Sequence, residues 1–214
     1  MSDKSNKYGY VGVDIPAQSF GANKGVFNPA EINDLVANNQ WTTFGQLELI
    51  ETQTVSSTVS AVEFLNLGNY NVHFFTYNNV QCTTDAKAVA LQFKISTGYV
   101  TSTYQYAYQY GIATGTFGPV QSTSQAQLFL AFQTGTAGNE KQNGYSYFYN
   151  LTDSSKYSFQ TKHSTGIRNV PDYISGFGSG VYPTANEVIG FKVFGETTTN
   201  IETGTFSLYG IRYS

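Results

Sequence analysis

Charged residues are scarce in this 214-residue chain. Asp, Glu, Lys and Arg make up 12% of it, against about 25% in typical globular domains, and the formal net charge is −3. Aromatic residues reach 16%, whereas disordered chains are rich in charge and poor in aromatics. Nucleic-acid binding needs a basic surface, which this composition does not supply. We therefore expect a folded domain with no nucleic-acid partner.

Cysteine and long apolar runs are also nearly absent. Cys82 is the only cysteine, so no disulfide framework or cysteine metal site can form, and we expect a small buried residue there. No window approaches the roughly 18 apolar residues of a membrane span. Residues 1–7 are polar and lack the apolar core of a signal peptide. These features predict synthesis in a reducing cytosol and no membrane partner.

Residues suited to metal binding or acid–base chemistry are few. The two histidines, His73 and His163, have no second histidine or carboxylate at metal-ligand spacing. We expect His73 to be a satisfied strand residue and His163 to lie in a solvated turn over residues 162–164. A Ser-His-Asp triad assembled from distant segments stays open.

Two further motifs point away from catalysis. In the segment 176–180, Gly-Phe-Gly-Ser-Gly, the glycines are in the wrong register for a nucleophile elbow, and we interpret it as a turn or bulge. Glu48 and Glu51 fall on opposite sides of a regular strand, which disfavours a glycosidase pair. The sequence therefore predicts a protein that is not an enzyme and has no cofactor or metal.

The first forty residues differ from the rest. Residues 1–24 are polar and predict an extended arm. Asn28 can cap a helix, Pro29 suits its first position, and Glu31 completes a capping-box-like arrangement, so we expect a short helix ending near residues 38–39. The arm and helix either dock on a partner or plug one end of the larger body. The expected docking residues are Tyr8, Tyr10, Phe20, Phe27, Ile32, Leu35 and Trp41.

From Gly45 onward, hydrophobic residues alternate with polar ones, as in half-buried strands. Turn clusters rich in Gly, Asn, Ser and Thr separate the runs. We predict a mainly β fold, an antiparallel β-sandwich over residues 42–214, preceded by the arm and helix at 1–41. The expected strands include residues 47–49, 62–64, 72–77, 89–94, 128–132, 188–194 and 201–211.

Two tyrosine-rich segments have alternating tyrosines that would share one face of a strand. These are Tyr104, Tyr106, Tyr108 and Tyr110 in one segment and Tyr145, Tyr147 and Tyr149 in the other. Such a face fits the edge of a core or a contact with a neighbouring subunit, because Tyr buries its ring and keeps its hydroxyl solvated. The alternative is a stacking platform for sugars on Tyr104 to Tyr110. The absence of charge between Lys94 and Glu140 suits either a protein contact or a neutral glycan.

Several motifs resemble segments of structural proteins of tailed bacteriophages. They are Gly25–Ile32 with its close at Asn39–Trp41, Tyr70–Phe74, Gly144–Asn150 and the ending Gly204–Ile211. In this order and span they are most similar to small virion proteins of contractile-tailed phages of marine bacteria. The resemblance implies a β-sandwich of jelly-roll type on the particle exterior and supplies no catalytic residues.

On this basis we expect a non-enzymatic virion protein that is made in the host cytoplasm. It would decorate or reinforce the head, or attach to the tail, through its N-terminal arm. Its partners would be major capsid or tail proteins and further copies of itself. The alternative is a receptor-binding module of a tail fibre or tail tip, which would stack host glycans on the tyrosines between Tyr104 and Tyr110. A depolymerase is the weakest alternative, because the central stretch has no carboxylates.

Overall fold

The computed structural model describes residues 29–37, 47–197 and 199–212. Strands account for most of the described residues, and helix for a small share of them. The single helix in the described part, α1 (Pro29–Ala37), belongs to a different unit from the strands, and each unit is described by itself. No helix of the described ranges is long and apolar enough to cross a membrane. The prediction of a mainly β protein with one short helix is confirmed.

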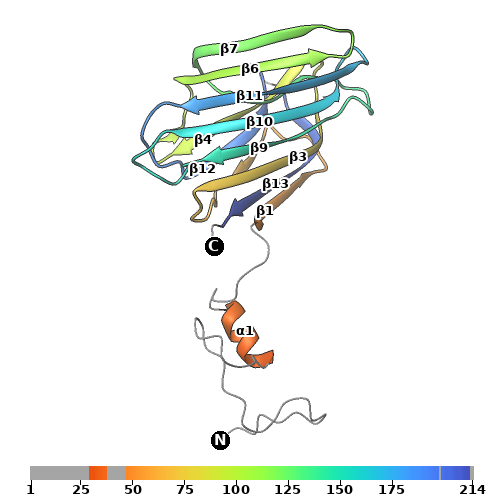
Figure 1. The fold of residues 1–214 in the computed structure, drawn as a ribbon. Coiled ribbons are helices and arrows are strands. Elements are labelled where there is room, and N and C mark those ends of the chain that lie inside the picture. The colour runs from red at the N-terminus through yellow and green to blue at the C-terminus, as the bar shows by residue number, and fades with distance from the viewer. Residues whose placement is uncertain (1–28, 38–46, 198, 213–214) are drawn as a thin grey trace, which may run out of the picture. The chain divides into compact units, whose positions relative to one another are not determined.

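One sheet has eight strands, all paired antiparallel (Figure 1). Its strands in spatial order are β1 (Leu47–Val55), β13 (Ile201–Ile211), β3 (Val72–Cys82), β9 (Gln142–Tyr149), β10 (Ser158–Ile167), β11 (Tyr173–Tyr182), β6 (Tyr104–Ile112) and β7 (Phe117–Gln125). The strands β9, β10 and β11 are neighbours both in the chain and in the sheet. The N- and C-terminal strands of this unit, β1 and β13, therefore pair at one edge.

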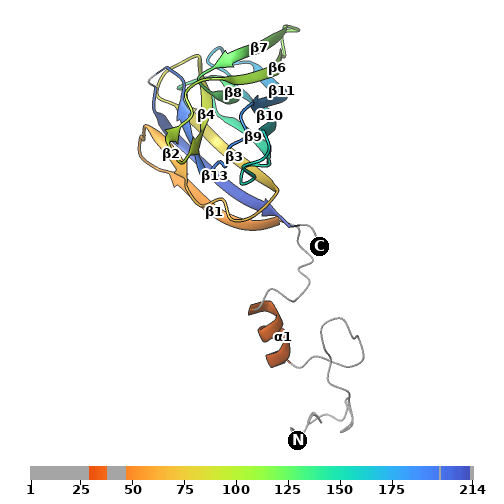
Figure 2. The same ribbon diagram turned by 90° about the vertical axis from the view of Figure 1, so that its left-hand side faces the viewer.

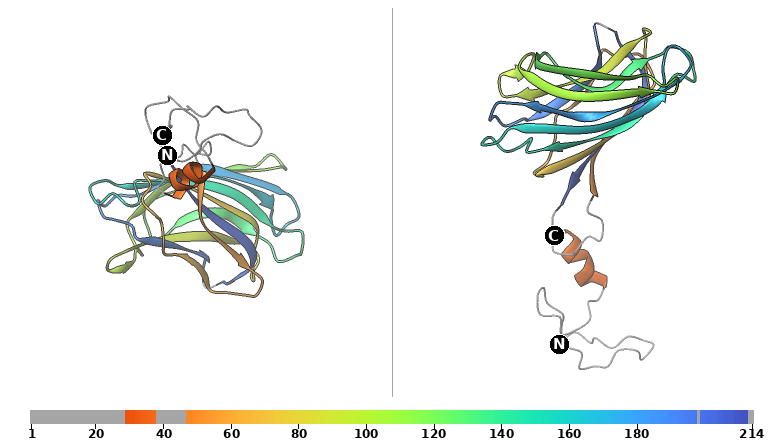
Figure 3. Two further views of the ribbon diagram at one scale, coloured as in Figure 1. Left: turned by 90° about the horizontal axis from the view of Figure 1, so that it is seen from below. Right: turned by 45° about the horizontal axis from the view of Figure 1, so that its top comes forward.

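The second sheet faces the first and forms the other layer of a sandwich (Figures 2 and 3). It comprises β2 (Ala61–Phe64), β12 (Gly190–Gly195), β4 (Lys87–Ile95) and β5 (Gly98–Tyr99), and β8 (Leu128–Thr134) pairs with β4. This arrangement confirms the predicted antiparallel sandwich. It does not confirm the jelly-roll connectivity that the resemblance implies.

Aromatic side chains from both sheets interlock in the core. Phe75 of the large sheet lies edge-on to Phe191 of the small sheet at 5.2 Å, and Phe148 lies edge-on to Phe93 at 5.9 Å. Phe64 stacks on Phe191 at 5.1 Å. All five side chains are fully buried. Each such ring pair adds roughly 0.5–1.5 kcal/mol beyond the burial of its surface, so these contacts hold the two layers together.

The helix begins at Pro29, as its capping sequence predicts, and ends at Ala37. The ring of Pro29 suits this position because its missing N–H would have no partner in the first turn. The arm over residues 1–24 and the cap at Asn28 lie outside the described residues. Those two expectations remain predictions.

Two segments predicted as turns are strands. Residues 162–164 lie within β10, and the glycine-rich segment 176–180 lies within β11. A side chain at Gly180 would approach Leu128 Cδ2 to 2.5 Å, and one at Gly176 would approach the Phe132 ring to 3.2 Å. Glycine therefore serves here to let β8 side chains reach the backbone of β11, which is a packing role rather than a turn role.

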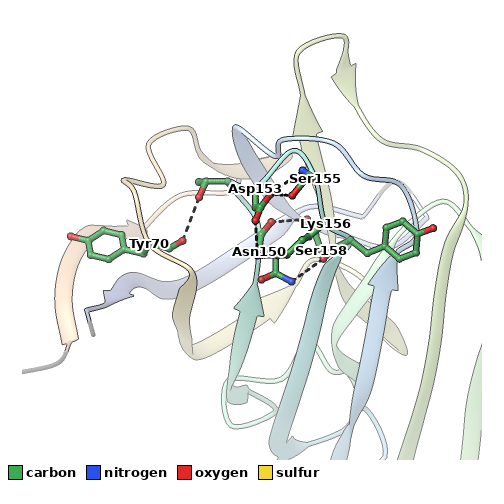
Figure 4. A network of polar contacts seen from close by, with 8 residues as sticks. Tyr70, Asn150, Asp153, Ser155, Lys156 and Ser158 are labelled. Carbon is green, nitrogen blue, oxygen red and sulfur yellow. Dashed lines mark hydrogen bonds and ion pairs between the residues drawn. The ribbon is translucent and has the colours of Figure 1, made fainter. Parts of the chain in front are cut away.

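The loop that joins β9 to β10 is held by its own polar groups (Figure 4). Asn150 has a positive φ of 60°, and its carbonyl accepts a hydrogen bond from the N–H of Asp153 at 3.2 Å. Asp153 forms an ion pair with Lys156 at 2.8 Å and accepts from Ser155, and these contacts lower the pKa of its carboxyl. Leu151 at the base of the loop is fully buried. These contacts hold the loop in place, and they give Asp153 and Lys156 a structural role within it.

Candidate functional site

The tyrosines of β6 point into the sandwich. Tyr104 is 0% exposed, Tyr106 9% and Tyr108 3%, while Tyr110 is half-buried. The hydroxyl of Tyr108 donates to Gln160 Oε1 at 2.7 Å, and burial raises the pKa of this phenol. A sugar cannot reach the buried rings of Tyr104, Tyr106 and Tyr108, so the predicted sugar-stacking platform is wrong for these three residues. The alternation correctly placed these tyrosines on one face, but that face belongs to the core.

The other residues singled out for docking divide into two groups. Ile32 and Leu35 lie on α1 and are half-buried. Tyr8, Tyr10, Phe20, Phe27 and Trp41 lie outside the described residues. A docking role for the arm and helix therefore remains a prediction.

His73 and Cys82 have structural environments. His73 is fully buried and its Nε2–H donates to the carbonyl of Leu67 at 2.8 Å, while burial lowers the pKa of the ring. Cys82 is fully buried, and burial raises the pKa of its thiol. The expected burial of Cys82 is confirmed, whereas His73 is buried in a strand but satisfied at one ring nitrogen, because its Nδ1 has no hydrogen-bond partner among the described residues. Neither residue is placed to meet a ligand from solvent.

One set of outward side chains on the large sheet contains no carboxylate, ammonium or guanidinium group; the exposed Glu202 lies near the start of β13, outside this set. We call the outward side chains of β13, β3, β9, β10, β11 and β6 the outer face. They are Thr205, Ser207, Tyr209, Ile211, Val72, Phe74, Thr76, Asn143, Tyr145, Tyr147, Tyr149, Phe159, Thr161, His163, Thr165, Tyr173, Ser175, Phe177, Ser179, Val181, Gln105, Ala107 and Gln109. None of these residues is Asp, Glu, Lys or Arg, so the charge scarcity of the sequence is concentrated on one surface.

A continuous row of aromatic rings crosses the outer face. It runs from Tyr209 through Phe74, Tyr147, Tyr145 and His163 to Phe177. Successive ring centroids are 4.9 to 6.4 Å apart. Strands β13, β3, β9, β10 and β11 each contribute to this aromatic row. The sequence alone groups only the tyrosines of β9, because they alternate within one segment. The other rings of the row come from distant segments, and the strand register brings them beside the β9 tyrosines.

His163 contributes the imidazole of the aromatic row, and its Nε2 lies 3.4 Å from Ser175 Oγ. Such a pair resembles two members of a catalytic triad. No carboxylate lies on the outer face to act as the third member. In the described part of the chain, no group of three or more His, Cys, Asp or Glu side chains is arranged to hold a metal ion. We therefore interpret His163 as part of the aromatic surface.

An open groove of 720 Å³ adjoins one end of the outer face, beyond the aromatic row. Its walls include Thr54, Asn79, Asn139, Lys141, Asn143 and Tyr173. The pairing of β3 with β9 shifts register between Tyr77 and Val80, and the pairing of β13 with β3 shifts around Thr203. These bulges turn the strand ends apart, and such irregularities are common beside functional sites. We call this feature the polar groove.

A chain of hydrogen bonds fixes the side chains of the polar groove. The ammonium of Lys141 donates to Thr203 Oγ1 at 3.2 Å, and the Thr203 hydroxyl donates to the carbonyl of Asn79 at 3.1 Å. The Asn79 N–H in turn donates to Asn143 Oδ1 at 2.9 Å. Asn79 has a positive φ of 54°, a strained geometry for a residue other than glycine. No local sequence pattern marks this groove, because its walls come from strands β1, β3, β9, β10, β11 and β13 and from the loop between β8 and β9.

Comparisons with protein-family models, curated proteins and solved structures found no match to this chain. The function is therefore inferred from the outer face and the polar groove.

Proposed function

We propose that this chain is a non-enzymatic structural component of the exterior of a phage particle, where the outer face packs against a second copy of the chain. The uncharged aromatic row carries this proposal. Interface cores are depleted in charge and enriched in Tyr and Phe relative to other surfaces. Contiguous exposed aromatic surface is uncommon on soluble monomers and marks contact sites. The virion placement draws on the motif resemblance, and the N-terminal arm would supply the attachment.

The absence of charge favours a second copy as the occupant. A two-fold contact brings the same face of both copies together, so a face with charges of one sign would repel its copy. The outer face has no such charges, and its exposed rings, such as Tyr145 at 40% and Phe177 at 48%, would be buried on pairing. Desolvating these rings stabilises the pair at about 25 cal/mol per Å² of apolar surface.

Sedimentation velocity of the purified full chain tests the contact. We expect a concentration-dependent oligomer, which Tyr147→Arg dissociates because it places an unpaired charge in the aromatic row. Ser154→Arg, in the exposed β9–β10 loop, is the matched control and should leave the oligomer intact. A wild-type chain that stays monomeric at about 100 µM, a concentration well above typical oligomer Kd values, contradicts the contact.

Immunogold labelling of intact particles tests the virion placement. An antibody to the chain should label the head or the tail surface. A truncation lacking residues 1–24 should fold but fail to join particles, because the strands form a unit separate from the N-terminal segment. Purified particles that contain no copy of the chain would contradict the proposal that it is a virion component.

A further inference from the structure

The geometry points to a second site: we propose that the polar groove binds a saccharide that carries a carboxylate. This binding does not depend on the virion placement. The polar groove shares Asn143 and Tyr173 with the outer face, so a sugar bound there would compete with a second copy at this end of the face. The ammonium of Lys141 would donate to the carboxylate, and the amides of Asn143 and Asn139 would hydrogen-bond to sugar hydroxyls. The Tyr173 side chain would stack on the sugar ring. The inference rests on charge, free hydrogen-bonding capacity and shape.

Lys141 supplies the charge. Among the residues that the structure describes, it is the only charged one that lines the polar groove, and it forms no ion pair with any of them. An ammonium has three donors, and Lys141 uses two of them on Gln81 Oε1 and Thr203 Oγ1, each at 3.2 Å. The neighbouring carboxylate of Glu140 is buried and accepts from the N–H of Ala137 instead. A fixed cation with a free donor and no carboxylate partner among the described residues favours an anionic ligand group.

The remaining walls suit a sugar better than a bare anion. Asn143 accepts from Asn79 through Oδ1, which leaves its two N–H donors without a partner among the described residues. Tyr173 is 47% exposed, and its hydroxyl is held by Thr165 Oγ1 at 3.2 Å. Sugar hydroxyls pair with amides and threonines, while the C–H face of a pyranose packs on an aromatic ring. A groove of 720 Å³ falls within the usual range for small-molecule sites.

The site is pre-organised, because Lys141, Thr203, Asn79 and Asn143 are already bonded to one another. Binding would therefore cost little side-chain entropy. The glycan site proposed here therefore differs from the one that the sequence predicted. It lies in the solvent-accessible polar groove and not on the buried tyrosines of β6, and Lys141 makes it suited to an acidic glycan instead of a neutral one.

Binding of the full chain to an array of sialylated, uronate-containing and neutral glycans provides the first measurement. Each glycan that binds is then titrated by calorimetry beside its neutral analogue, such as 3′-sialyllactose beside lactose. We expect an acidic glycan to bind at least about tenfold more tightly than its analogue, because charge-assisted hydrogen bonds are roughly twice as strong as neutral ones. Binding of neutral glycans alone, or an array without acidic hits, overturns the proposal.

Two variants locate the site. Lys141→Met should weaken acidic-glycan binding about tenfold, the factor for one lost charged contact, whereas Lys156→Met in the β9–β10 loop should not. Gly138→Trp should abolish binding, since a side chain there meets no atom within 4 Å and would grow into the groove without strain. Ser154→Trp is its control. Circular dichroism establishes that each variant is folded.

A second hollow, on the outer face, is the alternative place where an acidic glycan could bind. It has a volume of 370 Å³ and lies beside Phe159, Ser179 and Ala107. Acidic-glycan binding that survives Gly138→Trp and Lys141→Met but disappears in Phe159→Ala would overturn the assignment to the polar groove.

Discussion

The Nζ of Lys162 lies 3.8 Å from the centre of the Phe132 ring, deep inside the sandwich. Its Nζ donates to the carbonyl of Leu130 at 3.1 Å, and no carboxylate of the described residues forms an ion pair with it. Lys162 is 4% exposed, and burial lowers the pKa of its amine well below the usual range. The folded protein therefore favours the neutral amine, which has consequences for its stability.

Stability should fall as the pH falls below about 10.5, the ordinary pKa of lysine. In that range the unfolded state binds the proton and the folded state does not, so acidification favours unfolding until the folded-state pKa is passed. Urea titrations between pH 6 and 9 should show the free energy of unfolding rising with pH, by up to roughly 1.4 kcal/mol per unit.

The variant Lys162→Met should remove this slope and raise the free energy of unfolding at pH 7 by roughly 1 kcal/mol, because it replaces a buried ionisable group with an apolar one of similar size. The Leu130 carbonyl keeps a donor in the variant, the Tyr77 hydroxyl at 2.7 Å. Lys94→Met, near the surface of the small sheet, is the control. A slope that persists in Lys162→Met assigns the effect to another group and contradicts this reading.

The buried tyrosines should set an alkaline limit. Burial raises the pKa of Tyr77, Tyr104 and Tyr108, so these phenols stay neutral in the folded state above pH 10. Unfolded tyrosines ionise there, and the stability they contribute is present below pH 10 and is lost as the pH rises further. Fluorescence-monitored unfolding should give maximal stability between about pH 9 and 10.

The removal of one buried hydroxyl tests the same network. Tyr108→Phe should lower the free energy of unfolding by about 1–3 kcal/mol at pH 7, because it leaves Gln160 Oε1 without its donor. Tyr145→Phe, on the outer face, should change it by less than about 0.5 kcal/mol. Equal effects at the two positions are incompatible with a buried β6 face.

The close contact of β8 with β11 predicts unequal effects at adjacent residues. Gly180→Val should destabilise the chain by more than about 2 kcal/mol, because its Cβ would meet Leu128 Cδ2 at 2.5 Å and Tyr108 Oη at 2.8 Å. Ser179→Val points its side chain to the exposed outer face and should be nearly neutral. Thermal denaturation of the pair checks this, and a tolerated valine at position 180 would show that β8 is not packed there.

The sequence predicted several elements well because their signals are local. The helix from Pro29 follows from its first-turn residues, and the strands around Val72, Val89 and Leu128 follow from apolar runs bounded by turn residues. The sequence did not predict strand β10, because in this strand polar residues point into the core and an aromatic residue points outward, the reverse of the usual alternation. Its inward residues include Gln160 and Lys162, while Phe159 faces out at 42% exposure.

That inversion has a tertiary cause. The inward polar groups of the large sheet bond to the backbone of β8: Gln160 donates to the Phe129 carbonyl at 3.3 Å, and Lys162 and Tyr77 donate to the Leu130 carbonyl. Buried backbone groups need partners, and here distant side chains supply them. A local pattern cannot reveal this, because the partners lie some thirty or more residues apart.

The sequence by itself determined the β class, the single short helix, the scarcity of charge and the two tyrosine faces, since each depends on neighbouring residues or on composition. Only the tertiary structure decided which tyrosine face is buried, which strands bring Tyr209, Phe74 and Phe177 into one row, and where Lys141 meets Asn143. Strand register and the facing of one sheet against another set these relations, and a shift of one residue would exchange the buried and exposed faces.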